Sequence, residues 1–243
     1  IIEAYQFLNQ RQSFGKPTME HALVRDKFRE VGSMYVANFY LVWRTIRALD
    51  NAENGDANAE HLLRLLTPMI KKSVSEEGVY IAREGMELMG GVGYIEDTVM
   101  PKIIRDLLVN PIWEGAGNIR ILDMLRASKK SKGLKILHNE IVAALKDHSD
   151  SATIIAVLDQ LYEVLDSFQS MSQEEVESTA KPVFEQLTKI YKLAVLSENL
   201  TDETKGWVQP AIDFFTEDIL NTPIGKRSPL TRDEVDALIA WNY

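Results

Sequence analysis

The residues best suited to chemistry lie in one short stretch, Asn110-Pro111-Ile112-Trp113-Glu114-Gly115-Ala116-Gly117. Glu114 is a carboxylate between an aromatic residue and a glycine, where the backbone is permissive. The apolar neighbours Pro111, Ile112 and Trp113 could form a dry wall beside it, and a desolvated carboxylate is a stronger base. The pattern favours a general base at Glu114 whose partner groups lie mostly outside this chain. An ordinary loop acid is the alternative interpretation.

Two further features are suited to holding a phosphate. The run Gly90-Gly91-Val92-Gly93 would let backbone N–H groups approach one, although it lacks the spacing and preceding strand of a dinucleotide fingerprint. Arg11, in the last turn of a predicted helix, supplies a cation. Each feature also has a structural explanation, because glycines end helices and an arginine at a helix end favours the helix dipole.

The sequence gives no sign of metal or thiol chemistry. The four histidines, His21, His61, His138 and His148, show no metal-ligand spacing relative to one another. The chain contains no cysteine, so it has neither a disulfide framework nor a thiolate nucleophile. A reducing compartment agrees with that composition, and we expect a cytoplasmic protein.

The length and charge of the chain indicate a sizeable core and argue against some classes of partner. The chain has 243 residues, a net charge of −9 and 45% hydrophobic residues, enough for a sizeable core. The acidic balance argues against nucleic acid or an anionic membrane as a main partner. No apolar run approaches the roughly 20 residues of a membrane-spanning helix. Ile1 to Gln10 reads as the middle of an amphipathic helix without a start signal, so we expect the chain to be the C-terminal part of something longer.

Helices must position the candidate residues. Apolar residues recur at helical spacing and no strand-like alternation persists, so the sequence predicts an all-α fold. Glycine and proline in Phe14-Gly15-Lys16-Pro17 end the first helix, and Gly90-Gly91 ends the third. For the first half of the chain we expect helices over residues 1–14, 18–50, 57–89, 99–108 and 117–126.

A change of composition follows the first half. Residues 127–133 are small and basic and predict a linker, which divides the chain into domains 1–130 and 131–243. The second half carries −7 of the net charge and no residue set suited to chemistry, so we expect it to pack on the first half or at a subunit interface. Its predicted helices cover about 134–148, 151–170, 173–198, 204–220 and 231–241, with a loop at Asn221 to Pro229 and capping-box spacing in Ser172/Glu175 and Thr231/Glu234.

Together the motifs resemble the C-terminal helical domain of the acyl-CoA dehydrogenase family. The shared order is Arg11-x-x-Phe14-Gly15, a long helix, Gly90-Gly91-x-Gly93, Arg105-Asp106 and Trp113-Glu114-Gly115. The resemblance covers residues 1–126. It is closest to large members with extra C-terminal helices, a group that includes the bacterial alkylation-response flavoprotein. It implies an up-and-down four-helix bundle followed by a smaller helical extension.

The resemblance also implies a reaction. Family members are oxidoreductases of fatty acid β-oxidation that convert an acyl-CoA thioester to the 2-enoyl-CoA. By this resemblance Glu114 removes the α-proton while the β-hydrogen leaves as a hydride to FAD, and Trp113 and Gly115 lie beside the substrate. The alternative is a non-catalytic helical oligomerisation or binding module derived from the same family.

The implied cofactor is FAD, bound across a subunit interface. By resemblance Arg11 meets the FAD diphosphate of a neighbouring subunit, Phe14 packs beside the nucleotide, and His21 is a further cofactor-binding residue. The residues that would complete the FAD contacts are Glu87, Gly90 and Gly91 on the adenosine side, and Ala116, Gly117 and Asn118 after the base. Glu87 stands where relatives carry glutamine, and Ala116 where they carry threonine.

The resemblance finally implies partners. They are an acyl-CoA substrate, a second copy of the chain in a homodimer or homotetramer formed through the bundle, and an electron-transfer flavoprotein as acceptor. A full member carries an N-terminal helical domain and a middle β-domain that hold the flavin ring and much of the acyl-CoA site. We therefore expect this chain alone to be inactive and to bind FAD weakly or not at all.

Overall fold

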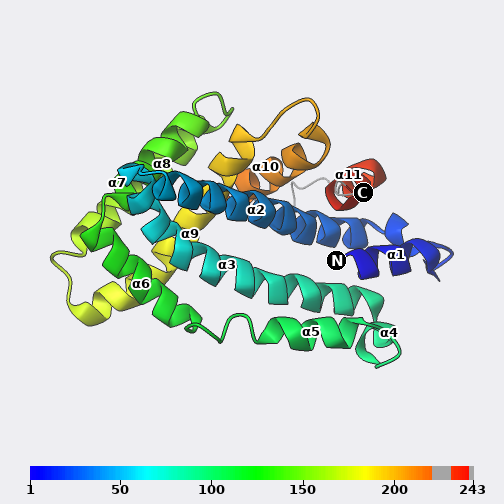
Figure 1. Cartoon of the computed structure of the whole chain (residues 1–243). Helices are drawn as coiled ribbons and strands as arrows, with labels where there is room; N and C mark the ends of the chain where they lie inside the picture. The colour runs from blue at the N-terminus through cyan, green and yellow to red at the C-terminus, as the bar shows by residue number, and fades with distance from the viewer. Residues whose placement is uncertain (221–230, 241–243) are drawn as a thin grey trace.

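The structure, a computed structural model, describes residues 1–220 and 231–240 (Figure 1). The all-α prediction is confirmed. The first half contains α1 (Ile2–Gln10), the short 3-10 helix η1 (Thr18–Glu20), α2 (Ala22–Glu53), α3 (Ala57–Met89), α4 (Gly91–Tyr94), α5 (Met100–Leu108) and α6 (Gly117–Lys130). The second half contains α7 (Gly133–Ala144), α8 (Ser151–Ser167), α9 (Gln173–Glu198), α10 (Lys205–Ile219) and α11 (Arg232–Ala240). The loop predicted at Asn221 to Pro229 lies outside the described residues.

The first helix ends earlier than predicted. After α1 ends at Gln10, β1 (Gln12–Ser13) pairs antiparallel with β2 (Lys16–Pro17). Phe14 and Gly15 form the turn, with φ of +50° and +80°. Positive φ at both central residues is the geometry of a two-residue hairpin and is incompatible with a right-handed helix. The expectation of a helix to residue 14 is therefore wrong.

The long helices α2 and α3 form the framework of the first half. They are joined by a tight turn at Asn54 and Gly55, and Asp56 caps α3 by accepting hydrogen bonds from the backbone N–H of Asn58 at 2.8 Å and Ala59 at 3.2 Å. α3 packs against α2 on one side and against α5 and α6 on another. This framework fixes both ends of the segment that carries Glu114. That four of the helices form an up-and-down bundle stays a prediction.

The second half covers α2. In Figure 1, α9 crosses the α2–α3 pair and α10 lies beside α2, and both helices contact α2 directly. Buried residues from both halves, such as Leu41 and Leu187, belong to one hydrophobic cluster. Packing of the second half on the first is thus confirmed. The division into two domains stays a prediction.

The predicted linker at residues 127–133 is mostly helical. α6 continues to Lys130 and α7 begins at Gly133, so only two residues separate the helices. Gly133 is needed there, because a Cβ on it would lie 2.6 Å from the carbonyl oxygen of His61. The small basic residues in this segment therefore make a tight corner and not a linker.

Both predicted capping boxes are present. At the start of α9, Ser172 Oγ accepts from the backbone N–H of Glu175 at 3.4 Å while the Glu175 carboxylate accepts from the Ser172 N–H at 2.9 Å. Thr231 and Glu234 make the same reciprocal pair before α11. Within the described ranges, no helix has the length and apolar character needed to cross a membrane.

Candidate active-site loop and cofactor-contact surface

The Glu114 loop joins α5 to α6 and has an unusual backbone. Glu114 has φ +59° and Gly115 has φ +110°, so two successive residues adopt left-handed conformations. A non-glycine residue in this region is strained, and such strain concentrates at functional sites. The backbone then returns to an extended conformation at Ala116, which is the N-cap residue of α6.

Two cations hold the loop to the helices. On the entry side, Lys71 of α3 donates a hydrogen bond to the carbonyl oxygen of Asn110. On the exit side, Arg120 Nε donates to the carbonyl oxygen of Gly115 at 3.4 Å. Glycine is favoured at position 115 by its positive φ, and a Cβ there would also force the Arg120 guanidinium to move. Sequence reasoning missed Lys71 and Arg120.

The side chains of the loop face outward. Glu114 is exposed, and Ile112 and Trp113 are 68% and 58% exposed. The expected dry wall beside Glu114 is therefore wrong for the described residues, because none of them packs over the loop. An exposed aromatic and an exposed aliphatic residue beside a carboxylate instead make an open surface that fits further protein or a ligand.

A second surface gathers Arg11 and the glycine run. Arg11 Nη1 donates to the carbonyl oxygen of Met89 at 3.2 Å, which places its guanidinium at the C-terminal end of α3. Gly90 has φ +67°, and a Cβ on it would lie 3.6 Å from Arg11 Nη1. An open depression runs beside them, lined by Phe7, Gln10, Arg11, Gly91, Val92 and Ile95. The structure thus brings together a cation and exposed glycine backbone, as phosphate binding requires.

Glu87, Phe14 and His21 lie around this surface. The Glu87 carboxylate is exposed and pairs with Arg83 at 3.4 Å, so its charge is partly offset. His21 Nε2 lies 3.1 Å from the carbonyl oxygen of Ser13, so this nitrogen carries the proton and donates to it. The His21 ring also contacts Phe14 edge-on at 6.0 Å. Phe14 itself is 98% exposed. The contacts that His21 makes with Ser13 and Phe14 thus hold the hairpin in the shape that presents the Phe14 ring.

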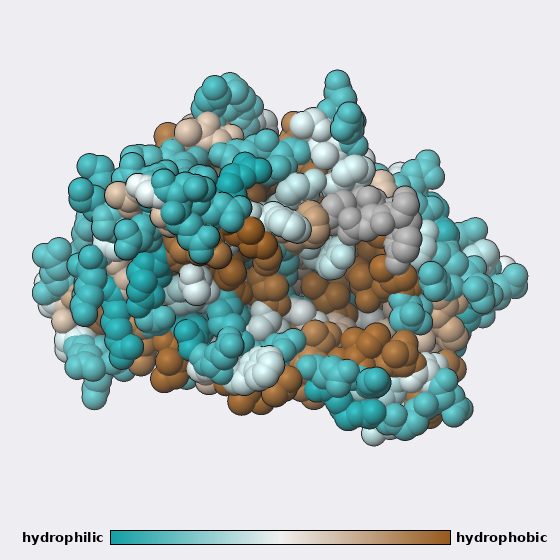
Figure 2. All heavy atoms as spheres, viewed as in Figure 1, coloured by the Kyte–Doolittle hydropathy of each residue, from teal (hydrophilic) through white to brown (hydrophobic). Residues whose placement is uncertain are grey.

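The two surfaces lie apart. In Figure 1, α1 and α4 lie at one end of α5, and the loop from α5 to α6 lies at the other. The end of α3, the start of α4 and the segment from the end of α1 to the start of α2 carry Arg11, Phe14, His21, Glu87, Gly90 and Gly91. The loop and the start of α6 carry Trp113, Glu114, Gly115, Ala116, Gly117 and Asn118. Apolar atoms are visible along the side of the molecule formed by α3 and α5 in Figure 2. The exposed apolar residues on and beside α5 are Val99, Leu108, Val109, Ile112 and Trp113.

The family model described as "Acyl-CoA dehydrogenase, C-terminal domain" matches residues 1–129, more than half of the chain. The chain belongs to the acyl-CoA dehydrogenase family. The family predicted from the motifs is thus confirmed.

Among its relatives, the chain is 35% identical over 138 residues to the Escherichia coli (strain K12) protein AidB, an alignment that covers 57% of this chain and 25% of AidB. This similarity agrees with the expected alkylation-response branch of the acyl-CoA dehydrogenases.

Solved acyl-CoA dehydrogenases extend the similarity to the second half. Caenorhabditis elegans ACDH-11 in complex with C11-CoA superposes with a TM-score of 0.77 at 25% identity, over 96% of this chain and 41% of that one. A Bacillus anthracis acyl-CoA dehydrogenase complexed with FAD shares the fold, with a TM-score of 0.52 at 15% identity, over 97% of this chain and 51% of that one. This chain therefore spans a quarter of AidB and about half or less of these solved relatives.

Proposed function

We propose that this chain is the C-terminal portion of an FAD-dependent acyl-CoA dehydrogenase in which Glu114 removes the α-proton of an acyl-CoA thioester. One observation carries the proposal: the family's aromatic-Glu-Gly motif lies on an outward-facing loop whose strained backbone presents Glu114 to whatever covers it. The exposed Ile112 and Trp113 would then be covered by parts of the protein outside this chain and by the acyl chain.

The residues of the second surface fit FAD. Arg11 beside the exposed Gly90 and Gly91 offers a cation to a diphosphate, which glycines without side chains let approach closely, and exposed Phe14 offers a face to an aromatic ring. The Glu87 carboxylate, which would oppose a diphosphate, is paired with Arg83 instead. FAD, when bound, accepts the hydride from the β-carbon. Since the Arg11 and Glu114 surfaces lie apart on one chain, they would serve different FAD molecules in an oligomer, as a homodimer or homotetramer allows.

The role of Glu114 follows from ordinary acid–base chemistry. The α-proton of a thioester is weakly acidic, so the base must be held against the α-carbon and kept from water. Hydrogen bonds from Lys71 to the Asn110 carbonyl oxygen and from Arg120 to the Gly115 carbonyl oxygen hold the loop on both sides of Glu114. Substrate and the remaining domains would exclude water, since the described residues leave Glu114 exposed. The isolated chain is accordingly inactive in this proposal, and an electron-transfer flavoprotein is the proposed acceptor.

The test is Glu114→Gln in the flavin-loaded full-length protein. Turnover of acyl-CoA should fall by about 10²–10⁴-fold, the usual contribution of a general base. Flavin content, measured by visible absorbance, should be retained, because Glu114 does not hold the cofactor. Glu53→Gln at the end of α2 is the matched control, since it makes the same change at an exposed glutamate outside the family motifs and should leave turnover unchanged. Unchanged turnover in Glu114→Gln would refute the base and favour a non-catalytic helical module.

A further inference from the structure

The exit of the Glu114 loop rests against a carboxylate of α3. Gly117, three residues after Glu114 and the first residue of α6, has no side chain, and a Cβ there would overlap Glu76 Oε1. The Glu76 carboxylate therefore lies directly beside the N-terminus of α6, where the helix dipole favours a negative charge. The structure therefore places a fixed negative charge against the first turn of α6, three residues after Glu114.

Lys72 fixes that carboxylate. Its Nζ donates to Glu76 Oε2 at 2.6 Å, one helical turn along α3, and its side chain is only 6% exposed. Burial alone would lower the pKa of Lys72, but its hydrogen bonds to Glu76 and Glu185 outweigh burial and raise the pKa. Lys72 is therefore a permanent cation at neutral pH.

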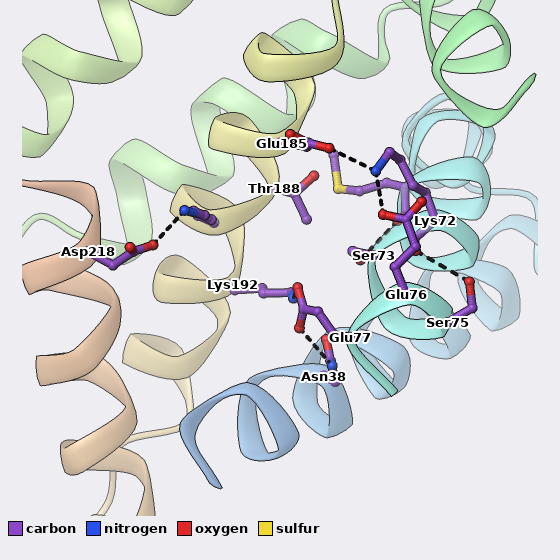
Figure 3. Close-up of polar contacts among 12 residues, drawn as sticks. Asn38, Lys72, Ser73, Ser75, Glu76, Glu77, Glu185, Thr188, Lys192 and Asp218 are labelled. Atoms are coloured by element: carbon purple, nitrogen blue, oxygen red, sulfur yellow. Dashed lines mark hydrogen bonds and ion pairs between the residues drawn. The ribbon is translucent and has the colours of Figure 1, made fainter. Parts of the chain in front are cut away.

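The second half of the chain completes this pairing. Glu185 of α9 accepts a hydrogen bond from Lys72 Nζ at 2.9 Å, so one buried ammonium group joins α3 to α9 (Figure 3). α9 lies beyond residues 1–129 that the family model matches. The described contacts thus run from Glu185 through Lys72 and Glu76 to Gly117 and the Glu114 loop.

A second lysine nearby lacks this connection. Lys192 of α9 is buried and donates to Glu77 Oε1 at 2.6 Å, and Asn38 of α2 donates to the other oxygen of Glu77 at 2.9 Å (Figure 3). This pair also joins α9 to α3. Its described partners include neither Glu76 nor Gly117, so it links the helices without touching the loop.

We propose that Lys72 and Glu185 are positioning residues for the proposed base Glu114, so that the C-terminal extension forms part of the catalytic apparatus. This inference rests on the proposed function. Loss of the Lys72 charge would free the Glu76 carboxylate, shift the start of α6 and displace Glu114 from the α-carbon. A displacement of about 1 Å can cost about 100-fold in rate.

The experiment compares two buried lysines in the flavin-loaded full-length protein. Lys72→Met should lower kcat by about 100-fold with the KM for acyl-CoA little changed, and Lys72→Arg should restore most of it. Lys192→Met, the matched control, should lower the melting temperature but keep kcat. Glu185 lies at the half-exposed end of the contact, so Glu185→Gln should fold. It should also lower kcat, by a smaller factor than Lys72→Met does.

Two results separate the possible failures. If kcat stays near wild type in both Lys72→Met and Glu185→Gln, or falls equally in Lys72→Met and Lys192→Met, the positioning role is overturned. If Lys72→Met does not fold, the lowered kcat of Glu185→Gln supports the role and an unchanged kcat overturns it. Glu114→Gln is measured in the same series, and its unchanged turnover would instead overturn the proposed function.

Discussion

At the scale of single residues, the sequence indicates which residue is the candidate base but not its surroundings. Trp113-Glu114-Gly115 identifies the motif, and the structure places Glu114 on a strained, exposed turn. Its exposure could not be predicted from apolar neighbours, since adjacency in sequence does not mean cover in space. Lys72 and Glu76 have the i, i+4 spacing of a helical ion pair, the one signal that could have found them.

Gly115→Ala tests the loop backbone. Alanine must adopt φ near +110° at this position, and its Cβ displaces the Arg120 guanidinium. This movement breaks the hydrogen bond that Arg120 donates to the carbonyl oxygen of residue 115. We expect a loss of about 1–2 kcal/mol in the free energy of unfolding, measured in urea. The control Gly206→Ala lies in α10 with its Cβ at an ordinary 3.5 Å from Ala237 and should be neutral or stabilising. Equal stability of both variants would contradict the account.

Asp123 gives a prediction for acid stability. A hydrogen bond from Arg64 at 2.7 Å, and behind it the charge of Arg120, hold the pKa of Asp123 below its ordinary 3.8. A lowered folded pKa stabilises the protein above pH 3.8, and this stability is lost as the pH falls through the folded pKa. Asp123→Asn should cost about 0.5 kcal/mol at pH 7 and less at pH 3, since the pair is partly exposed.

Urea unfolding between pH 7 and pH 3 measures this difference. Arg64→Met removes the other partner and should reproduce both the loss at pH 7 and its decrease in acid. If the free energy of unfolding of both variants differs from that of wild type by the same amount at every pH in this range, the Asp123 pair does not contribute to acid stability.

At the scale of elements, periodicity predicts helices well and corners poorly. The predicted helix 57–89 agrees with α3, because apolar spacing and the Gly90 stop are local signals. The Phe14-Gly15 hairpin was missed, because its turn looks like a helix stop and its two-residue strands are too short for alternation. The segment 127–133 was misassigned because its small residues fit a close approach between helices as well as a linker.

The cap of α9 is the most direct test at this scale. Ser172→Ala removes the acceptor for the Glu175 N–H and one side of the capping box, and should lower the free energy of unfolding by about 1 kcal/mol. Asp150, the N-cap residue of α8, makes no side-chain cap hydrogen bond, so Asp150→Ala should cost less than about 0.5 kcal/mol. A larger loss at Asp150 than at Ser172 would contradict the assignment.

At the scale of the whole molecule, the chain joins two outward-facing surfaces through one hydrophobic core. The all-α class followed from composition and periodicity, but the cover of α2 by α9 and α10 did not, because helix pairing depends on long-range packing. The separation of the end of α1, which carries Arg11, from the loop between α5 and α6, which carries Glu114, likewise appears only in three dimensions (Figure 1). It supports the proposal that one chain contributes to more than one flavin site.

This arrangement predicts the behaviour of the isolated chain. Residues 1–243 expressed alone should fold, since their core is continuous, but should purify without yellow colour and show no dye-linked acyl-CoA oxidation. The reason is that the residues proposed to contact FAD form an open surface that none of the described residues covers. The longer protein, prepared in parallel, should carry stoichiometric flavin. Stoichiometric flavin on the isolated chain would contradict this prediction.

The central claim, that Glu114 is the α-proton base, is tested most directly by hydrogen exchange at the α-carbon. Flavin-loaded full-length protein is mixed with acyl-CoA in D₂O, and mass spectrometry follows the replacement of the α-hydrogen by solvent deuterium. Wild type should exchange, and Glu114→Gln should exchange about 10²–10⁴-fold more slowly with its flavin retained. Exchange at the wild-type rate in Glu114→Gln would show that another group removes the proton.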